Sequence, residues 1–350
     1  MSSRNHRINL VAIIRCSRKL PHNFMTSPQL NRRWSYAREF LAVIALISCP
    51  LLTAEAADKK AKPEAAARLT KYPKCCVWRV TNAKAPFYFL GSMHSLSKGD
   101  YPLPSPYEMA IEESRRFVFE YDPTKDEEFQ RKFAEAGKYP PGQDIRNKIH
   151  PRTLSWLRDN TQYLDTTYNE RQKKYVTTVQ TFDAALQYKP WWIADRFFDV
   201  RSYTDASDKD GIDAYIEGRA RSAGKEIGGL ETVDEHVAVL GKLSDRDGEI
   251  LLLDTIVYID TARNEYYRTL AAWRRGDIDK LWMLDSRLRR EAPWIASRLV
   301  DIRNVMWIPR IEREIQSGKP TSIVAGALHF AGPNSVIKLL QKRGYTIEQL

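Results

Sequence analysis

The chain has 350 residues, of which 43% are hydrophobic, and its formal net charge is +11 at pH 7. Residues 1–56 hold eight Lys or Arg and two Asp or Glu, so the remainder carries 47 basic and 42 acidic residues and a net charge of +5. That charge is ordinary for a soluble protein, and the sequence has neither zinc-finger spacing nor an arginine-rich arm, which excludes a nucleic-acid-binding protein. The length suffices for one large domain or two.

The first 56 residues are predicted to be a signal peptide. Residues 40–52 are apolar, follow three arginines and precede Ala54-Glu55-Ala56. This is the order of a charged region, a short apolar region and a small-x-small cleavage site. The apolar run is broken by Pro50 and is too short to span a membrane comfortably. We expect cleavage near Ala56, and Met25 is an alternative start of the chain.

Cysteine usage fits an exported protein. Cys49 ends an imperfect lipoprotein box, so a lipid anchor there, or a retained membrane anchor, is the alternative to a cleaved peptide. Beyond residue 56 only Cys75 and Cys76 remain, and adjacent cysteines pair with each other only under strain. We interpret them as two buried strand thiols; a redox or metal-binding pair is the alternative. A chain without a disulfide framework fits export to the bacterial periplasm.

The expected elements begin with a linker and a hairpin. Residues 57–73 are polar and rich in Ala, which predicts a flexible linker. Two β-rich runs, at 74–81 and 86–91, are separated by four residues and predict a hairpin. A helix is expected at 107–114, where a proline precedes it, and a strand at 116–121, where an Asp-Pro pair ends it.

The middle of the chain is predicted to be mainly helical. Apolar residues recur at three-to-four spacing in six segments, which are residues 178–188, 191–200, 211–222, 249–275, 278–288 and 294–315. The short run at 225–230 could form a strand. Strand, helix and strand follow at residues 321–325, 333–343 and 345–350.

These elements predict one α/β domain over residues 74–350. Its central mixed sheet is formed by the N- and C-terminal strands, is flanked by helices and carries a large helical insert. The two ends of the domain must therefore meet in space.

Two short segments share a strand, a glycine and a histidine. One reads FYFLGSMH and the other SIVAGALH, and each places a histidine three residues after the glycine, as Gly91 with His94 and Gly326 with His329. Strands of an open α/β sheet present such side chains at their carboxyl edge, and glycine permits a close backbone approach there. Two imidazoles on one edge can bind a divalent metal ion, or one can act as a general base. The alternative is that each histidine caps a loop by hydrogen bonding.

Two glutamates stand where they could join these histidines. Glu120 ends the strand at 116–121, where a carboxylate needs a cation, a metal ion or solvent. It is the best candidate for a third metal ligand or a general base. Glu231 follows the run at 225–230, next to a capping box of Thr232 and Glu235. It belongs either to that cap or to the site.

Three further residues need an interpretation. Arg303 and Asn304 lie on the helix that leads to the second histidine. Arg303 could hold a substrate carboxylate or steady an oxyanion, although a helical arginine is more often a solvated ion-pair partner. His236 is interpreted as a surface or packing residue. The sequence has no Gly-x-Ser-x-Gly elbow, no phosphate-cradling loop and no His-Glu-x-x-His helix.

In this order, the motifs resemble the TraB/GumN family, whose eukaryotic relatives include the Tiki proteases. The similar segments run from Cys75 to Leu350 and read CCVWRV, FYFLGSMHSL, FVFEYDP, GLET, RN and VAGALHFAGPNSVIKLLQKRGYTI. The resemblance implies a compact α/β fold related to erythromycin esterase and ChaN-like proteins. It also implies a metal-dependent hydrolase, with peptidase activity in some branches only.

By position, the paired histidines of that family fall on His94 and His329, with their glycines at Gly91 and Gly326. Its acidic residue after the third strand falls on Glu120, its Gly-Leu-Glu-Thr segment on Glu231, and its Arg-Asn pair on Arg303 and Asn304. One departure is Phe330 after the second histidine, where leucine is commoner; the change is conservative.

The sequence therefore predicts an exported hydrolase in which His94, His329 and Glu120 hold a divalent metal ion, Zn, Mn or Co. A metal-bound water would attack a peptide or other acyl bond, with Glu120 or Glu231 as general base and Arg303 at the oxyanion. One alternative is a non-catalytic protein that sequesters a peptide or haem in the same cleft. Another is a metal-independent, esterase-like hydrolase with one histidine as base. Membrane contact is expected only through the signal segment or Cys49.

Overall fold

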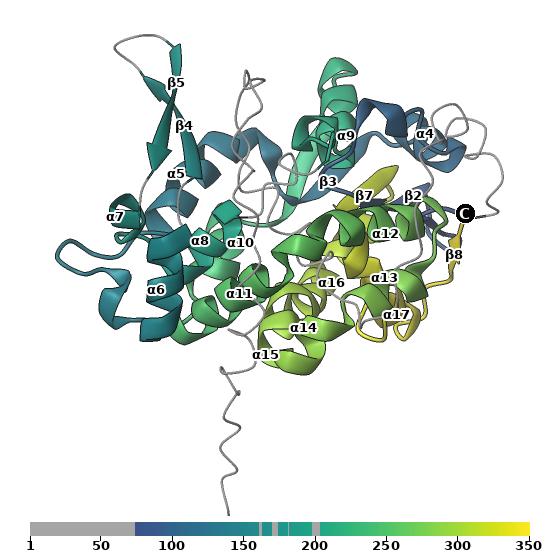
Figure 1. Ribbon diagram of the computed structural model, residues 1–350. Helices are drawn as coiled ribbons and strands as arrows, with labels where there is room; N and C mark the ends of the chain where they lie inside the picture. Colours follow the sequence, from purple (N-terminus) through teal and green to yellow (C-terminus); the bar gives the residue numbers. More distant parts are fainter. Residues whose placement is uncertain (1–73, 161–162, 170–173, 181, 198–203) are drawn as a thin grey trace, which may run out of the picture.

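A computed structural model describes residues 74–160, 163–169, 174–180, 182–197 and 204–350 (Figure 1). The signal peptide expected in residues 1–56, including Cys49, and the linker expected in residues 57–73 lie outside the described residues. In the part of the chain that the structure describes, no helix combines the length and the apolar character needed to cross a membrane.

The centre of the molecule is a six-stranded mixed sheet in the order β6-β3-β7-β2-β1-β8. Its strands are β1 (Val77–Val80), β2 (Phe87–Ser92), β3 (Arg116–Tyr121), β6 (Glu226–Glu231), β7 (Thr321–Gly326) and β8 (Ile347–Gln349). Strands β6, β3, β7 and β2 are parallel to one another, whereas β1 pairs antiparallel with both β2 and β8. The predicted α/β class, the hairpin and the meeting of the two ends of the domain are confirmed.

Helices cover both faces of this sheet, as Figure 1 shows: α4 and α9 lie on one side, and α12, α13, α16 and α17 lie on the other. The helices of at least six residues are α4 (Ser105–Glu113), α5 (Asp126–Ala136), α6 (Pro151–Asn160), α8 (Pro190–Phe197), α9 (Ile212–Ser222), α10 (Val233–Gly241), α11 (Asp245–Tyr258), α12 (Ala262–Arg274), α13 (Ile278–Leu284), α14 (Ser286–Glu291), α16 (Ile302–Gln316) and α17 (Val336–Gln341).

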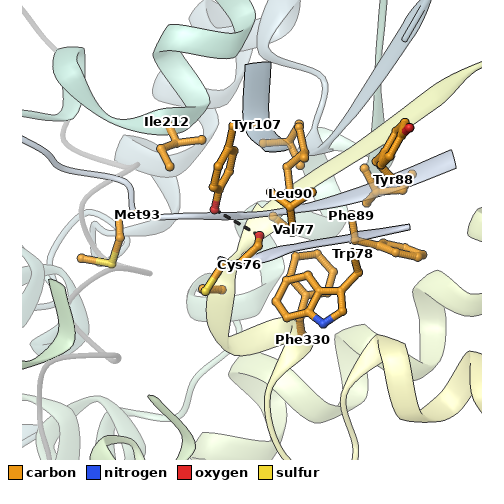
Figure 2. Close-up of a cluster of buried hydrophobic side chains, with 14 of the residues drawn as sticks. Cys76, Val77, Trp78, Tyr88, Phe89, Leu90, Met93, Tyr107, Ile212 and Phe330 are labelled. Carbon is orange, nitrogen blue, oxygen red and sulfur yellow. Dashed lines mark hydrogen bonds between the residues drawn. The ribbon is translucent and has the colours of Figure 1, made fainter. Parts of the chain in front are cut away.

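The apolar strands are buried because helices lie on both of their faces. All six residues of β2 are buried, and the ring of Phe89 lies 5.6 Å from that of Phe330 (Figure 2). Cys75 and Cys76 are buried free thiols, as predicted, but they lie just before β1 and not within it. The backbone oxygen of Cys76 accepts a hydrogen bond from the Tyr107 hydroxyl at 3.1 Å (Figure 2).

In the insert, one predicted helix is replaced by strands. Residues 178–188 do not form one helix: β4 (Tyr163–Asn169) and β5 (Lys174–Gln180) make a two-stranded antiparallel sheet, and α7 covers only Phe182–Ala185. The run Tyr-Val-Thr-Thr-Val in β5 is rich in residues that favour strands, and this preference outweighs the helical spacing. Figure 1 shows this hairpin projecting away from the central sheet.

Two predicted helices are interrupted. The segment 249–275 is α11 and α12, joined by a short turn at Ile259–Thr261, and the segment 278–288 is divided at Asp285. Neither Gly nor Pro marks these breaks. The apolar residues of two successive helices therefore have one continuous spacing, which predicts a single helix. The segment 294–315 holds as a helical run: α15 (Pro293–Ala296), a π-helical turn (Ser297–Asp301) and α16 follow one another directly.

Candidate functional site

The two Gly-x-x-His segments leave the sheet side by side. β2 and β7 are parallel neighbours, with Ser92 paired to Gly326 in their register, so both chains emerge at the same carboxyl edge. His94 follows β2 in a loop, and His329 lies in the short 3-10 helix Ala327–Phe330 after β7. Both histidines are buried, with 8% and 3% of their surface exposed. The predicted common edge is therefore present.

Three of the predicted site residues meet at the α-carbon of Gly326. Its N–H donates a hydrogen bond to Glu120 Oε1 at 2.8 Å. A Cβ added there would lie 3.3 Å from His94 Nε2, 3.4 Å from Glu120 Oε1 and 3.8 Å from His329 Cδ2. Glycine thus leaves room where these side chains converge. Gly91 has a different role. A Cβ added to it would lie 3.0 Å from the Cβ of Cys76, so glycine here allows close packing against Cys76.

Arg303 reaches from α16 to the ends of two strands. Its Nη2 donates to Glu120 Oε2 at 2.6 Å, and its Nε donates to Glu231 Oε1 at 2.7 Å. Burial is the largest single influence and would raise the pKa of both carboxyls, but Arg303 and the neighbouring histidines together outweigh it. The pKa of Glu231 falls to about 2, and that of Glu120 also lies well below its ordinary value. Both glutamates are consequently ionised at neutral pH although they are buried.

Glu231 has two more partners besides Arg303. The indole Nε1 of Trp307 donates to its Oε1 at 2.9 Å, and His236 Nδ1 lies 2.6 Å from its Oε2. Of the two roles considered for His236, surface and packing, the structure supports packing: the residue is buried, with its ring 4.7 Å from that of Tyr121. The available signal was its place in the first turn of α10, directly after the strand that carries Glu231.

Asn304 holds the ring of His329. Its Nδ2 donates to the backbone oxygen of Asn334 at 2.9 Å, and its Oδ1 lies 2.6 Å from His329 Nδ1. An amide oxygen only accepts, so Nδ1 of His329 carries the proton and Nε2 carries the lone pair. Burial lowers the pKa of His329 to about 3, so the ring is neutral at pH 7. Its Nε2 lies 3.7 Å from Glu120 Oε1 and 3.3 Å from Arg303 Nη1.

His94 is held by a residue that the sequence analysis missed. Its Nδ1 lies 2.8 Å from Oδ2 of Asp213, in the first turn of α9. No motif marked Asp213, and the contact joins residues 119 positions apart. Only the Gly-Ile-Asp start of the expected helix at 211–222 placed a carboxylate near a helix end.

The fit to a metal ion is mixed. The donor types are suitable, because imidazole nitrogens and a carboxylate bind Zn, Mn or Co. However, no group of three or more His, Cys, Asp or Glu side chains among the described residues is arranged to hold a metal ion. Both oxygens of Glu120 also accept hydrogen bonds, from Gly326 and from Arg303. As arranged, the side chains do not form a complete three-ligand site.

All six predicted polar residues of the site lie within one hydrogen-bonded cluster or at its edge; they are His94, Glu120, Glu231, Arg303, Asn304 and His329. The structure thus places them together, while their catalytic, oxyanion-binding and metal-binding roles stay predictions. His236, Trp307 and Asp213 complete the arrangement.

Comparison with known proteins adds one finding. The model of the TraB/PrgY/gumN family matches residues 76–349, which covers the sheet, both Gly-x-x-His segments and all residues of the cluster. No curated protein matches the chain, and no solved structure matches it either.

Proposed function

The chain belongs to the TraB/PrgY/gumN family, and on that premise we propose that it is an exported hydrolase of peptide or other acyl bonds. The observation that carries the proposal is the meeting of His94 Nε2, Glu120 Oε1 and His329 at the α-carbon of Gly326. Lone-pair nitrogens and an ionised carboxylate at one buried point are what the activation of water requires.

In this proposal, Glu120 and His94 supply the bases. A water molecule between Glu120 Oε1 and His94 Nε2 would give a proton to one of them as its oxygen attacks the acyl carbon. The carbon–nitrogen or carbon–oxygen bond then breaks, and the leaving group takes up the proton. Arg303 keeps Glu120 ionised and Glu231 holds Arg303, which supports a positioning contribution from both.

The metal-dependent form of the reaction is the second candidate. Nδ1 of His94 faces a carboxylate and Nδ1 of His329 faces an amide oxygen, which directs both Nε2 atoms toward the site. Metal-binding histidines are commonly oriented in this way. His94, His329 and Glu120 would hold the ion, which would supply Lewis-acid polarisation of the acyl oxygen. Because the three donors do not form a complete site as arranged, no step of the mechanism above depends on a metal.

The deciding experiment measures hydrolysis of a fluorogenic peptide library and of aryl esters by the purified mature protein. Variants Glu120→Gln and His94→Ala should lose most of the activity, whereas His150→Ala, which alters an exposed histidine, should retain it. Dialysis against a chelator followed by addition of Zn, Mn or Co separates the candidates: activity that survives favours the metal-free reaction, and activity lost and regained favours the metal-dependent one.

Absence of turnover on every substrate, with tight and saturable binding of a peptide or of haem, would overturn the proposal in favour of a sequestering protein. Export is tested separately by the N-terminal sequence of the protein recovered from the periplasm, which should begin near residue 57. Recovery with the apolar segment intact, or with lipid on Cys49, would favour the anchored alternative. A protease activity like that of the Tiki proteases is part of the same proposal, and cleavage of the peptide substrates tests it.

A further inference from the structure

The two histidines match in sequence but are held by chemically different groups. His94 Nδ1 faces the carboxylate of Asp213 at 2.8 Å, whereas His329 Nδ1 faces the amide oxygen of Asn304 at 2.6 Å. Both partners can only accept a hydrogen bond through these oxygens, so both fix the proton on Nδ1. A carboxylate, in addition, raises the basicity of the opposite ring nitrogen. His94 and His329 are therefore not chemically equivalent.

The carboxylate of Asp213 is fixed in place by a close approach of α9 to the His94 loop. A Cβ added to Gly211 would lie 1.9 Å from the backbone oxygen of His94, so only glycine allows this approach. One residue on, the N–H of Ile212 donates to the backbone oxygen of Met93 at 3.0 Å. Figure 2 shows Met93 and Ile212 at the same end of the sheet.

A second connection ties the same two segments together. The backbone groups of Leu96 and Ser207 exchange hydrogen bonds, at 3.2 Å and 2.8 Å, in an isolated antiparallel bridge. The loop that carries His94 and the segment that leads into α9 are thus joined on both sides of the histidine. Asp213 lies in the first turn beyond these contacts, and its side chain is largely buried. Its position relative to His94 follows from the backbone.

From this geometry we propose that Asp213 is a positioning residue for His94. It fixes the ring with the proton on Nδ1, and so directs the lone pair of Nε2 toward Gly326 and Glu120. It acts through the imidazole and does not touch the substrate. Its effect on rate rests on the proposed hydrolase function, whereas its effect on the ring of His94 does not.

The test combines spectroscopy with kinetics on the mature protein. Beyond residue 56 the chain has four histidines, so ¹⁵N-histidine labelling gives a simple imidazole spectrum, which a His94→Gln variant assigns. In the parent, His94 should show a protonated Nδ1 and an unprotonated Nε2. In Asp213→Ala the two tautomers should mix, and in Asp213→Asn, which copies the Asn304 arrangement, the Nδ1–H form should persist.

For hydrolysis, Asp213→Ala should lower kcat about 10- to 100-fold, the usual loss for such a partner, with KM within about twofold. Asp213→Asn should recover part of that loss. The matched control is Glu217→Gln, which removes a carboxylate one turn further along α9 that pairs with Arg221, and it should change neither readout.

An unchanged His94 spectrum in Asp213→Ala would overturn the positioning role, whatever the activity. An altered spectrum with unchanged kcat would overturn its bearing on rate. If the parent hydrolyses nothing, the spectrum still decides the positioning role, so failure of the hydrolase proposal is recognised separately. If Asp213→Ala does not fold, Asp213→Leu, which keeps the bulk of the side chain but offers no acceptor to Nδ1, decides by the same two readouts, and a spectrum and kcat equal to the parent would overturn the proposal.

Discussion

Replacement of Arg303 by methionine removes the only cation that hydrogen-bonds Glu120 in the described part of the chain, while keeping the length and apolar stem of the side chain. Glu231 loses two hydrogen bonds from the guanidinium, at 2.7 Å and 2.9 Å. The variant therefore leaves two carboxylates buried, with 5% and 7% of their surface exposed, and without their charge partner.

The expected loss of stability is large. Breaking a buried ion pair by removing one partner costs about 3–5 kcal/mol, because the other charge remains buried. The pKa of Glu231 falls from 4.5 to about 2, which corresponds to about 3 kcal/mol of stabilisation of the ionised form. This value is similar to the cost of breaking the ion pair. We expect Arg303→Met to reduce the free energy of unfolding by about 4 kcal/mol at pH 7.

The loss should depend on pH with a definite sign. In the parent, folding lowers the pKa of Glu231. The ionised carboxylate therefore stabilises the folded state fully above pH 4.5, and this stabilisation is lost as the pH falls through about 2. In Arg303→Met, burial without the cation raises the pKa of both glutamates above the unfolded value, so the variant loses stability as the pH rises through that raised pKa. The difference between parent and variant should therefore be larger at pH 7 than at pH 5.

Urea denaturation followed by tryptophan fluorescence at both pH values measures this difference, and titrating groups that do not contact Arg303 cancel in it. The control is Arg310→Met, on the same helix, which breaks a partly exposed pair with Glu235 and should cost about 1 kcal/mol or less. The triple variant Arg303→Met with Glu120→Gln and Glu231→Gln should regain much of the loss. A loss for Arg303→Met no larger than the control, or one that shrinks toward pH 7, would refute this reasoning.

Three further predictions concern residues near the site. Gly326→Ala, which places a methyl group between His94 and Glu120, should lower the proposed hydrolysis at least about tenfold with a normal circular dichroism spectrum; full activity would contradict the proposed role of this meeting point. Gly211→Ala should lower the melting temperature, since its methyl group would overlap the backbone of His94. Burial raises the pKa of the Cys75 thiol to about 12 and that of Cys76 well above its usual value, so neither should react with a thiol reagent at pH 8 before unfolding, as measured by absorbance.

The sheet was predictable because its strands are visible as local patterns. The strand at 116–121 matches β3 residue for residue, and the run at 225–230 lies within one residue of β6. Both Gly-x-x-His strands are buried runs that end at one edge, so the meeting of His94 and His329 followed from sheet geometry alone. The positions of these strands and the common edge of the two histidines could therefore be predicted from short segments of the sequence.

Contacts between distant segments were not predictable in the same way. Nothing local distinguishes Asp213 from other carboxylates in first turns of helices, and its role depends on how closely α9 approaches the His94 loop. His236 looked like an ordinary helical residue because its partner, Glu231, lies on the preceding strand rather than on the same helix face. The break in the segment 249–275 also has no local marker.

The cluster around Arg303 has a consequence for when the candidate site forms during folding. Its hydrogen bonds join residues separated by up to 206 positions along the chain, from the end of β3 to the end of β7. Contacts of such sequence separation form late, because closing the long intervening loop costs chain entropy before the contact can offset it. During refolding, the proposed hydrolysis should therefore appear after helical structure and after collapse, and a chain cut between β3 and β7 should recover it only when both fragments reassociate.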